Sequence, residues 1–359
     1  MSVEIPVEIT DITPAWLSAA LQEGGMRGVE VENVTSQRIA EGVGFIGQIH
    51  RLSIDYADTG DGAPATVIAK MPTGDPGGRM VGAMMRLYEK ESGFYRHLAD
   101  ECPAGTATCY YNGADIDAGN YCLLLEDLSG FEPGDQLTPR NLDQAQEMLA
   151  QLARIHGSWA GDRGAAHSWL PSIDDASSLV MLGMFDDAYP VTMERYAHVI
   201  PSYMHDWGPK FAKVAPQWLA DFAGQPSTIV HGDYRTDNFM FGDNGTSRLL
   251  DWQVMSRSPG AYDVYYFLGL SCDPQMVADN LDPLLELYRE EHAATGTPAP
   301  DVETLLQQMR GVGLWLTTLG TVSFSQLDPA NERGEALFLS MWERGISLAE
   351  RIDLSPLVP

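Results

Sequence analysis

The first third of the chain contains several short runs with strand character, and in one of them, at 48–56, apolar and polar residues alternate. Alternation with a period of two predicts half-buried strands, whereas apolar residues at helical spacing predict helices with one buried face. We predict strands at residues 36–41 and 48–56, the second with clear alternation. VIAKM at 67–71, which follows a DTGDGAP turn signal, and the apolar run YCLLLEDL at 121–128 are predicted to be strands as well. The helical spacing instead occurs at residues 12–23 and 79–100, so this third is predicted to be mainly β with two helices.

The pattern changes after Gly134 to long stretches with helical spacing. The dipeptide Thr138-Pro139 predicts the start of a helix that runs to about Trp159. Further helices are predicted near residues 176–205, 209–223, 260–271, 281–294, 301–323 and 332–351, with two short strand-like pieces, STIVH and SRLLDW, among them. The chain is therefore predicted to be α+β with two lobes. The expected division is a small β-rich N-terminal lobe at 1–125, a connecting hinge at 126–131 and a larger helical lobe at 132–359.

The net charge of the chain argues against two classes of binding partner. Lys and Arg number 22 against 50 Asp and Glu, which gives a formal net charge of −28. Nucleic acids and anionic membranes are bound through clustered Lys and Arg, so this charge argues against both. The four cysteines form no Cys-x-x-Cys pair, the N-terminus has no apolar signal segment, and no apolar run approaches the roughly 18 residues of a membrane span. We therefore expect a cytoplasmic protein.

The most informative stretch is TIVHGDYRTDNFMF at 228–241, followed by RLLDWQ at 248–253. Within it Asp233, Asn238 and Asp251 each follow an apolar strand-like run, where a polar side chain costs free energy unless it is paired or holds a cation. The amide of Asn238 and the carboxylate of Asp251 suit Mg²⁺, which prefers oxygen ligands and keeps waters for substrate phosphates. Asp233 then remains to accept a proton from an alcohol. These are the parts that phosphoryl transfer requires.

A matching set of residues lies upstream. A G-x-G-x-x-G spacing is formed by Gly42, Gly44 and Gly47. A predicted strand follows it, which favours a hairpin over a nucleoside triphosphate rather than a dinucleotide-binding turn. Lys70 lies in the strand VIAK, and Glu91 lies on the helix that follows, with Glu89 as the alternative partner of the lysine. A strand lysine held by a helix glutamate would be aimed at the phosphates of ATP.

The ordered motifs VHGDYRTDN and LLDWQ resemble the catalytic and metal-binding motifs of the aminoglycoside phosphotransferase and choline kinase superfamily. The segments EDL followed by GF at 126–131, DWQ at 251–253 and SPGAYDVYYFLGLS at 258–271 resemble its ecdysteroid kinase-like branch in particular. The resemblance spans roughly residues 36–272 and implies a two-lobed protein-kinase-like fold with ATP and Mg²⁺ as cofactors.

The resemblance also implies roles for single residues. It assigns the catalytic base to Asp233, the Mg²⁺ ligands to Asn238 and Asp251, the ion pair to Lys70 and Glu91, and the adenine-binding hinge to Leu125, Glu126 and Leu128. Arg235 occupies the place of a phosphate-contacting lysine in serine/threonine protein kinases, and Asp263 matches the residue that braces the catalytic loop.

The predicted function is ATP-dependent phosphorylation of a hydroxyl on a small molecule. The segment between Asp251 and the SPG turn at 258 is too short to present a peptide, so the expected acceptor is an alcohol. Candidates are a bulky steroid-like or polyketide-like alcohol and an aminoglycoside. Two alternatives remain open: a catalytically silent nucleotide-binding pseudokinase, and a metal-dependent hydrolase that uses His231, Asp233 and Asp251. The sequence predicts neither the oligomeric state nor a preference for ATP over GTP.

Overall fold

The computed structural model describes residues 3–39, 47–60, 62–328 and 330–357. The chain divides into two compact units. Unit 1 comprises Met1–Pro133 and Phe239–Val254, and unit 2 comprises Gly134–Asn238 and Met255–Pro359.

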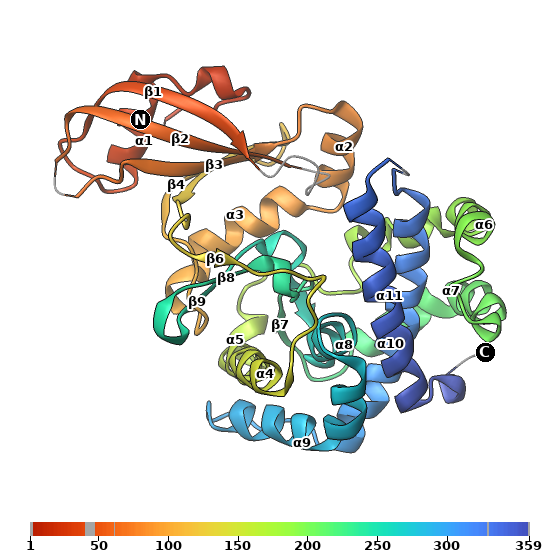
Figure 1. The fold of residues 1–359 in the computed structure, drawn as a ribbon. Helices are drawn as coiled ribbons and strands as arrows, with labels where there is room; N and C mark the ends of the chain where they lie inside the picture. Colours follow the sequence, from red (N-terminus) through yellow and green to blue (C-terminus); the bar gives the residue numbers. More distant parts are fainter. Residues whose placement is uncertain (1–2, 40–46, 61, 329, 358–359) are drawn as a thin grey trace. The chain divides into compact units, whose positions relative to one another are not determined.

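Unit 1 is built on a five-stranded antiparallel sheet with the strand order β1-β2-β3-β5-β4 (Figure 1). Its strands are β1 Glu30–Ile39, β2 Gly47–Asp58, β3 Thr66–Pro72, β4 Cys109–Asp115 and β5 Asn120–Glu126. Of the strand predicted at 36–41, residues 36–39 form the last part of β1, and residues 40–41 lie outside the described residues. This edge strand is almost entirely exposed, with Val31 as its buried residue, so most of it lacks the alternation that marks a half-buried strand.

A helix packs against each face of this sheet. On one face, Leu17, Ala20 and Leu21 of α1 (Pro14–Glu23) join a core with Val67 and Ala69 of β3. On the other face, α3 (Leu87–His97) packs against β5, and the side chains that meet there include Leu87, Tyr88, Leu123 and Leu125. Because successive strand residues point to opposite faces, Ala69 in the first core places Lys70 on the α3 face.

The helix predicted at 79–100 is two helices, α2 (Pro76–Met84) and α3. Arg86 separates them. Its φ of 57° is a left-handed backbone conformation, which interrupts a right-handed α-helix. Its guanidinium donates two hydrogen bonds to Glu89, of 2.7 and 2.8 Å, at the start of α3. Apolar spacing continues across the break, which is why the pattern alone reads as one helix.

The segment Phe239–Val254 packs within unit 1, whereas the sequence-based division assigns it to the helical lobe. It contributes β8 (Phe239–Phe241) and β9 (Ser247–Leu249) to a small sheet with β6 (Glu132–Pro133), in the order β6-β8-β9. Trp252 then stacks on Phe94 of α3, with ring centroids 4.0 Å apart and planes 7° from parallel. A fully buried indole in this position ties the segment to unit 1.

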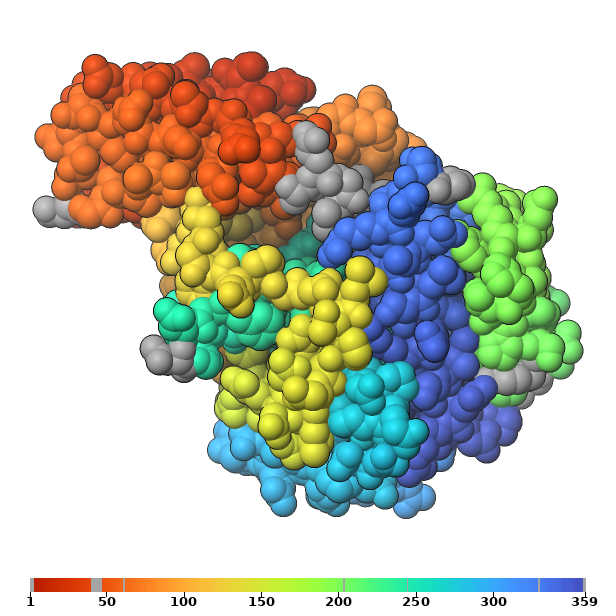
Figure 2. Space-filling model, viewed as in Figure 1, coloured from red at the N-terminus to blue at the C-terminus, as the bar shows by residue number. Residues whose placement is uncertain are grey.

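Unit 2 is helical, apart from a two-stranded sheet of β7 (Thr228–Val230) and β10 (Ser256–Ser258). Its helices are α4 Leu142–Ser158, α5 Asp162–Ala165, α6 Phe185–Tyr196, α7 Ser202–Ala223, α8 Ala261–Leu270, α9 Pro274–Ala293, α10 Val302–Ser325 and α11 Glu332–Ile352. Helix α10 packs against α6, α7, α8 and α11. Figure 2 shows the surfaces of α11 (blue) and α6 (green) side by side, where the Tyr196 hydroxyl donates to Glu335 at 3.0 Å. The structure confirms the α+β class.

Two predicted helix starts in unit 2 are displaced, and side-chain caps explain both. Helix α4 begins at Leu142 rather than at Thr138, because Asn141 and Gln144 form a reciprocal capping box. Helix α9 begins at Pro274 rather than near residue 281, because Asp273 accepts a hydrogen bond from the backbone N–H of Met276.

Candidate active site

In unit 1, Lys70 lies buried between two carboxylates. Its Nζ donates to Glu91 Oε1 at 2.7 Å and to Asp251 Oδ1 at 2.8 Å. Burial opposes the charge on this amine, but the carboxylates of Asp251 and Glu91 outweigh burial and raise the pKa of Lys70. Burial also raises the pKa of Glu91, against the pull of Lys70. A lysine that contacts two carboxylates at these distances stays charged, so we describe the cluster as an ion-paired triad.

The structure brings Lys70 together with Glu91 and not with Glu89. Glu91 is buried on the face of α3 that meets the sheet, whereas Glu89 forms an ion pair with Arg86. The second oxygen of Glu91, Oε2, is buried and has no hydrogen-bond partner within the described ranges. The lysine is therefore the main anchor of this carboxylate.

Asp251 directly precedes the stacked Trp252 and has a φ of 67°. Aspartate tolerates this left-handed region better than most residues. Its Oδ1 accepts from Lys70, and its Oδ2 accepts from Gln253 Nε2 at 3.1 Å. The Trp-Gln pair that follows Asp251 therefore has a structural role on each side: the indole anchors the backbone, and the amide orients the carboxylate.

The glycine-rich stretch is described only in part. Gly42 and Gly44 lie outside the described residues. Gly47 is the first residue of β2 and pairs with Pro72, and two residues further on Ile49 pairs with Lys70. The register therefore places the end of the glycine-rich stretch on the strand next to Lys70.

The predicted hinge residues lie at the end of β5. Leu125 pairs with Ile68 and is buried, as is Leu128, in the core beneath α3. Glu126 has its side chain engaged, because Oε2 accepts from both the backbone N–H and the hydroxyl of Thr108 at 3.0 Å. The side chains of these three residues are thus engaged within the fold.

Arg51 is a residue of this region that sequence reasoning missed. Its guanidinium donates to both carboxylate oxygens of Asp127, at 2.8 and 3.3 Å. Burial opposes the charge on Asp127, but hydrogen bonds from Arg51, Thr66 and Ser129 outweigh burial and lower its pKa. No local pattern links residues 76 positions apart, so only the fold reveals this contact.

In unit 2, Asp263 of α8 hydrogen-bonds the backbone of the loop that follows β7. Its carboxylate accepts from the backbone N–H groups of His231, at 2.6 Å, and Gly232, at 2.9 Å. His156 of α4 contacts the same carboxylate through Nε2 at 3.2 Å. His231 is buried, and its Nδ1 accepts from the backbone N–H of Asp233, which favours a structural role for this histidine.

Replacing Asp263 with Asn is expected to lower the free energy of unfolding by about 1–3 kcal/mol, because the amide loses one of the two acceptor oxygens in a fully buried site. Urea denaturation measures the difference. Asp282→Asn makes the same change of charge at an exposed position of α9 and serves as the control. Equal stabilities of the two variants would contradict the bracing role of Asp263.

Asp233 receives hydrogen bonds from three side chains of unit 2. The Tyr266 hydroxyl donates to Oδ1 at 2.5 Å, and the Asn238 amide nitrogen donates to Oδ2 at 2.8 Å. Arg235 Nε lies 3.1 Å from Oδ1 and 3.2 Å from Oδ2. Sequence reasoning identified Asn238 and Arg235 but missed Tyr266, although this last tyrosine of the GAYDVYY segment lies within the motif that carries the family resemblance.

The orientation of Asn238 fits a metal ligand. Its Nδ2 donates to both the backbone oxygen and the Oδ2 of Asp233, each at 2.8 Å. Both described hydrogen bonds use the amide nitrogen, so the carbonyl oxygen is available to a cation. An oxygen ligand of this kind matches the preference of Mg²⁺.

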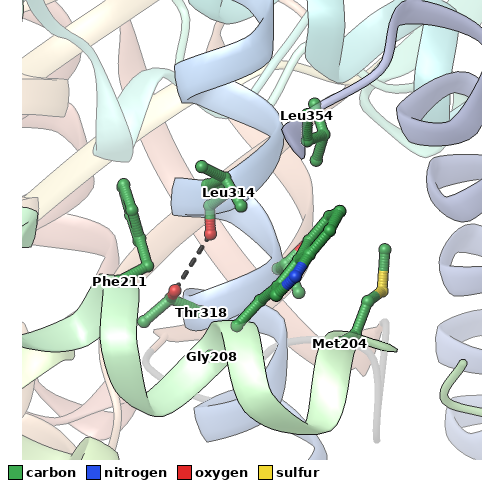
Figure 3. Close-up of a pocket in the computed structure, with 8 residues that line it drawn as sticks. Met204, Gly208, Phe211, Leu314, Thr318 and Leu354 are labelled. Carbon is green, nitrogen blue, oxygen red and sulfur yellow. Dashed lines mark hydrogen bonds between the residues drawn. The ribbon is translucent and has the colours of Figure 1, made fainter. Parts of the chain in front are cut away.

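Unit 2 also contains a small apolar cavity of about 10 Å³, room for roughly one water molecule. Its lining residues are Met204, Trp207, Gly208, Phe211, Leu314, Thr317, Thr318 and Leu354 (Figure 3). The Thr318 hydroxyl donates to the backbone oxygen of Leu314 at 2.9 Å. None of the lining residues is a candidate site residue, so the WLTTL stretch at 315–319 serves mainly as helix core.

Comparison with solved structures shows the fold. The chain is similar to a candidate aminoglycoside phosphotransferase from Ralstonia eutropha, with 15% identity, a TM-score of 0.55 and coverage of 92% of this chain and 97% of the other. It is also similar to a variant of aminoglycoside 2′-phosphotransferase-IIIa in complex with GDP, with 14% identity, a TM-score of 0.52 and coverage of 94% and 98%. The predicted two-lobed kinase-like fold is thereby confirmed.

Comparison with sequences gives a family. No curated protein matches the chain. In the part of the chain that the structure covers, no helix has the length and apolar character needed to span a membrane. The model of the ecdysteroid kinase-like family matches residues 41–296, a range that holds every candidate site residue. The chain therefore belongs to the ecdysteroid kinase-like family.

Proposed function

We propose that the protein is a kinase that transfers the γ-phosphoryl group of ATP to a hydroxyl of a small molecule. The observation that carries the proposal is the buried triad in which Lys70 lies between Glu91 and Asp251. Membership in a kinase-like family supports it. A lysine fixed in this way presents a positive charge to nucleotide phosphates, and phosphoryl transfer relies on such positioning and charge.

The nucleotide residues of this proposal lie in unit 1. Lys70 contacts the phosphates, and Glu91 holds the lysine in place. The glycine-rich stretch with Gly42, Gly44 and Gly47 covers the phosphates, and the hinge at 126–131 with Leu125, Glu126 and Leu128 receives the base. The proposed lobes are 1–125 and 132–359, with Phe239–Val254 packed in unit 1.

The transfer residues lie mainly in unit 2. Asp233 orients the acceptor hydroxyl and takes its proton as the acceptor oxygen bonds to the γ-phosphorus. The bond from that phosphorus to the bridging oxygen breaks, and ADP leaves. Arg235 contacts a phosphate, for which its guanidinium is suited. Asn238 and Asp251 would hold Mg²⁺, which supplies neutralisation of the phosphate charge.

The acceptor we propose is a bulky hydroxylated alcohol of steroid-like or polyketide-like shape, or an aminoglycoside. The short segment after Asp251 supports a small-molecule acceptor rather than a peptide. The 3₁₀ helix at Trp252–Val254 is followed within a few residues by β10 and α8, which leaves no room for the long activation segment that presents a peptide. One solved structure of similar fold is a GDP complex, so GTP is tested beside ATP.

The experiment is a transfer assay with γ-labelled ATP or GTP and Mg²⁺ against a panel that contains a hydroxysteroid, a polyol, an aminoglycoside and choline. We expect a labelled organic product with at least one alcohol. A pseudokinase would instead bind the nucleotide, raising the melting temperature, and label nothing. A metal-dependent hydrolase would release phosphate from an ester without nucleotide, and its activity would survive loss of the Lys70 charge.

A further inference from the structure

The carboxylate of Asp233 is held on both oxygens before any substrate is bound. Tyr266 donates to Oδ1, Asn238 donates to Oδ2, and Arg235 is shared between the two oxygens. A carboxylate offers about four lone-pair positions, so these three donors leave roughly one for an acceptor hydroxyl. The donors therefore decide from which direction an alcohol reaches this carboxylate.

The Tyr266 contact differs from the other two in chemistry and origin. Asn238 and Arg235 belong to the same loop as Asp233, whereas Tyr266 contacts the loop from α8. Burial and the Asp233 carboxylate raise the pKa of Tyr266, so its hydroxyl keeps the proton and is the donor. At 2.5 Å, an O–H donor on a carboxylate forms a strong hydrogen bond.

Helix α8 itself is fixed relative to the loop. Asp263 lies three residues before Tyr266 and holds the loop backbone through His231 and Gly232. Tyr262, one turn before Tyr266, lies nearly parallel to it, with the ring planes 15° apart. Its hydroxyl is hydrogen-bonded by the indole of Trp315. Helix α8 thus positions the loop backbone through the carboxylate of Asp263 and the Asp233 side chain through the phenol of Tyr266.

We infer that Tyr266 is a positioning residue that fixes the Asp233 carboxylate for proton acceptance from the alcohol, a role that rests on the proposed function. The phenol does not touch the reacting atoms. It holds Oδ1 and so restricts rotation of the carboxylate about its last side-chain bond. Misplacement of a catalytic group by about 1 Å can cost roughly 100-fold in rate.

The test compares Tyr266→Phe with Tyr265→Phe. Each removes one phenol hydroxyl from α8, but the Tyr265 hydroxyl donates to the backbone oxygen of Gly345 at 3.1 Å. With the best alcohol from the panel and MgATP, we expect Tyr266→Phe to lower kcat roughly 10-fold to 100-fold. The KM values for alcohol and nucleotide should change by less than about threefold, because binding contacts remain.

A double variant separates positioning from a structural effect. If Tyr266 acts through Asp233, then Tyr266→Phe should lower kcat little further in an Asp233→Asn background, because the two residues act as one unit. Multiplicative effects of the two substitutions, or equal kcat values of the Tyr266 and Tyr265 variants, would overturn the inference. If the wild type itself labels no alcohol and hydrolyses no MgATP, the proposed function fails instead, which is a separate result.

Discussion

Replacement of Asp233 with Asn is expected to lower the rate of phosphoryl transfer roughly 10³-fold, the usual contribution of a positioned general base. The amide has nearly the same shape but cannot take a proton from the alcohol. It also presents an N–H₂ group to Tyr266 or to Asn238, both of which donate to the carboxylate in the wild type. The measurement is kcat with the best alcohol of the panel.

Nucleotide binding gives the internal check for this variant. Asp233 does not belong to the set of residues proposed to hold the nucleotide, so the Kd for MgATP should stay within about threefold of the wild type. Asp221→Asn removes the same charge at an exposed position of α7 and is the matched control. Retention of more than a tenth of the wild-type kcat by Asp233→Asn would contradict the role of Asp233 as the base.

Replacement of Lys70 with Met should weaken nucleotide binding and lower kcat/KM for ATP by roughly 100-fold or more. The variant also leaves Glu91 and Asp251 facing each other without their shared cation. Removing one partner of a buried pair typically costs about 3–5 kcal/mol, so a fall in stability is expected as well. Isothermal titration with MgATP and urea denaturation measure the two effects.

A second substitution distinguishes loss of function from loss of folding. In Lys70→Met/Glu91→Gln, one of the two carboxylates that lost the lysine becomes neutral, so part of the lost stability should return. Transfer should not return, because the charge on the phosphates is still missing. Lys210→Met, at an exposed position of α7, is the control for the loss of a lysine. Recovery of activity in the double variant would refute a phosphate-binding role for Lys70.

Local pattern was sufficient where a residue's neighbours in sequence determine its surroundings. The VIAK run could be recognised as a strand, and a lysine in an apolar strand requires a counter-charge once the strand is buried. The helix that follows supplied two candidate carboxylates, and the choice between Glu89 and Glu91 depended on the break at Arg86. A left-handed residue in that position has no strong signature unless it is Gly, Asn or Asp, so the pattern alone could not place the break.

Contacts between residues that lie far apart in the chain could not be predicted from the sequence pattern. The hydroxyl of Tyr266 and the guanidinium of Arg51 meet their partners only once the fold exists. The assignment of Phe239–Val254 to unit 1 likewise depends on the stacking of Trp252 on Phe94. Resemblance to a family identified the loop residues Asp233 and Asn238, since their order and spacing lie within one short segment.

The backbone at Asp251 constrains how this family can lose activity during evolution. With a φ of 67°, the position accepts Asp, Asn or Gly without penalty, whereas other residues there cost about 1–2 kcal/mol. Drift toward a silent relative would therefore pass first through Asn or Gly, which remove the carboxylate and keep the backbone conformation. An alignment of relatives should show Asn or Gly at this position in inactive members, and alanine or β-branched residues should be rare.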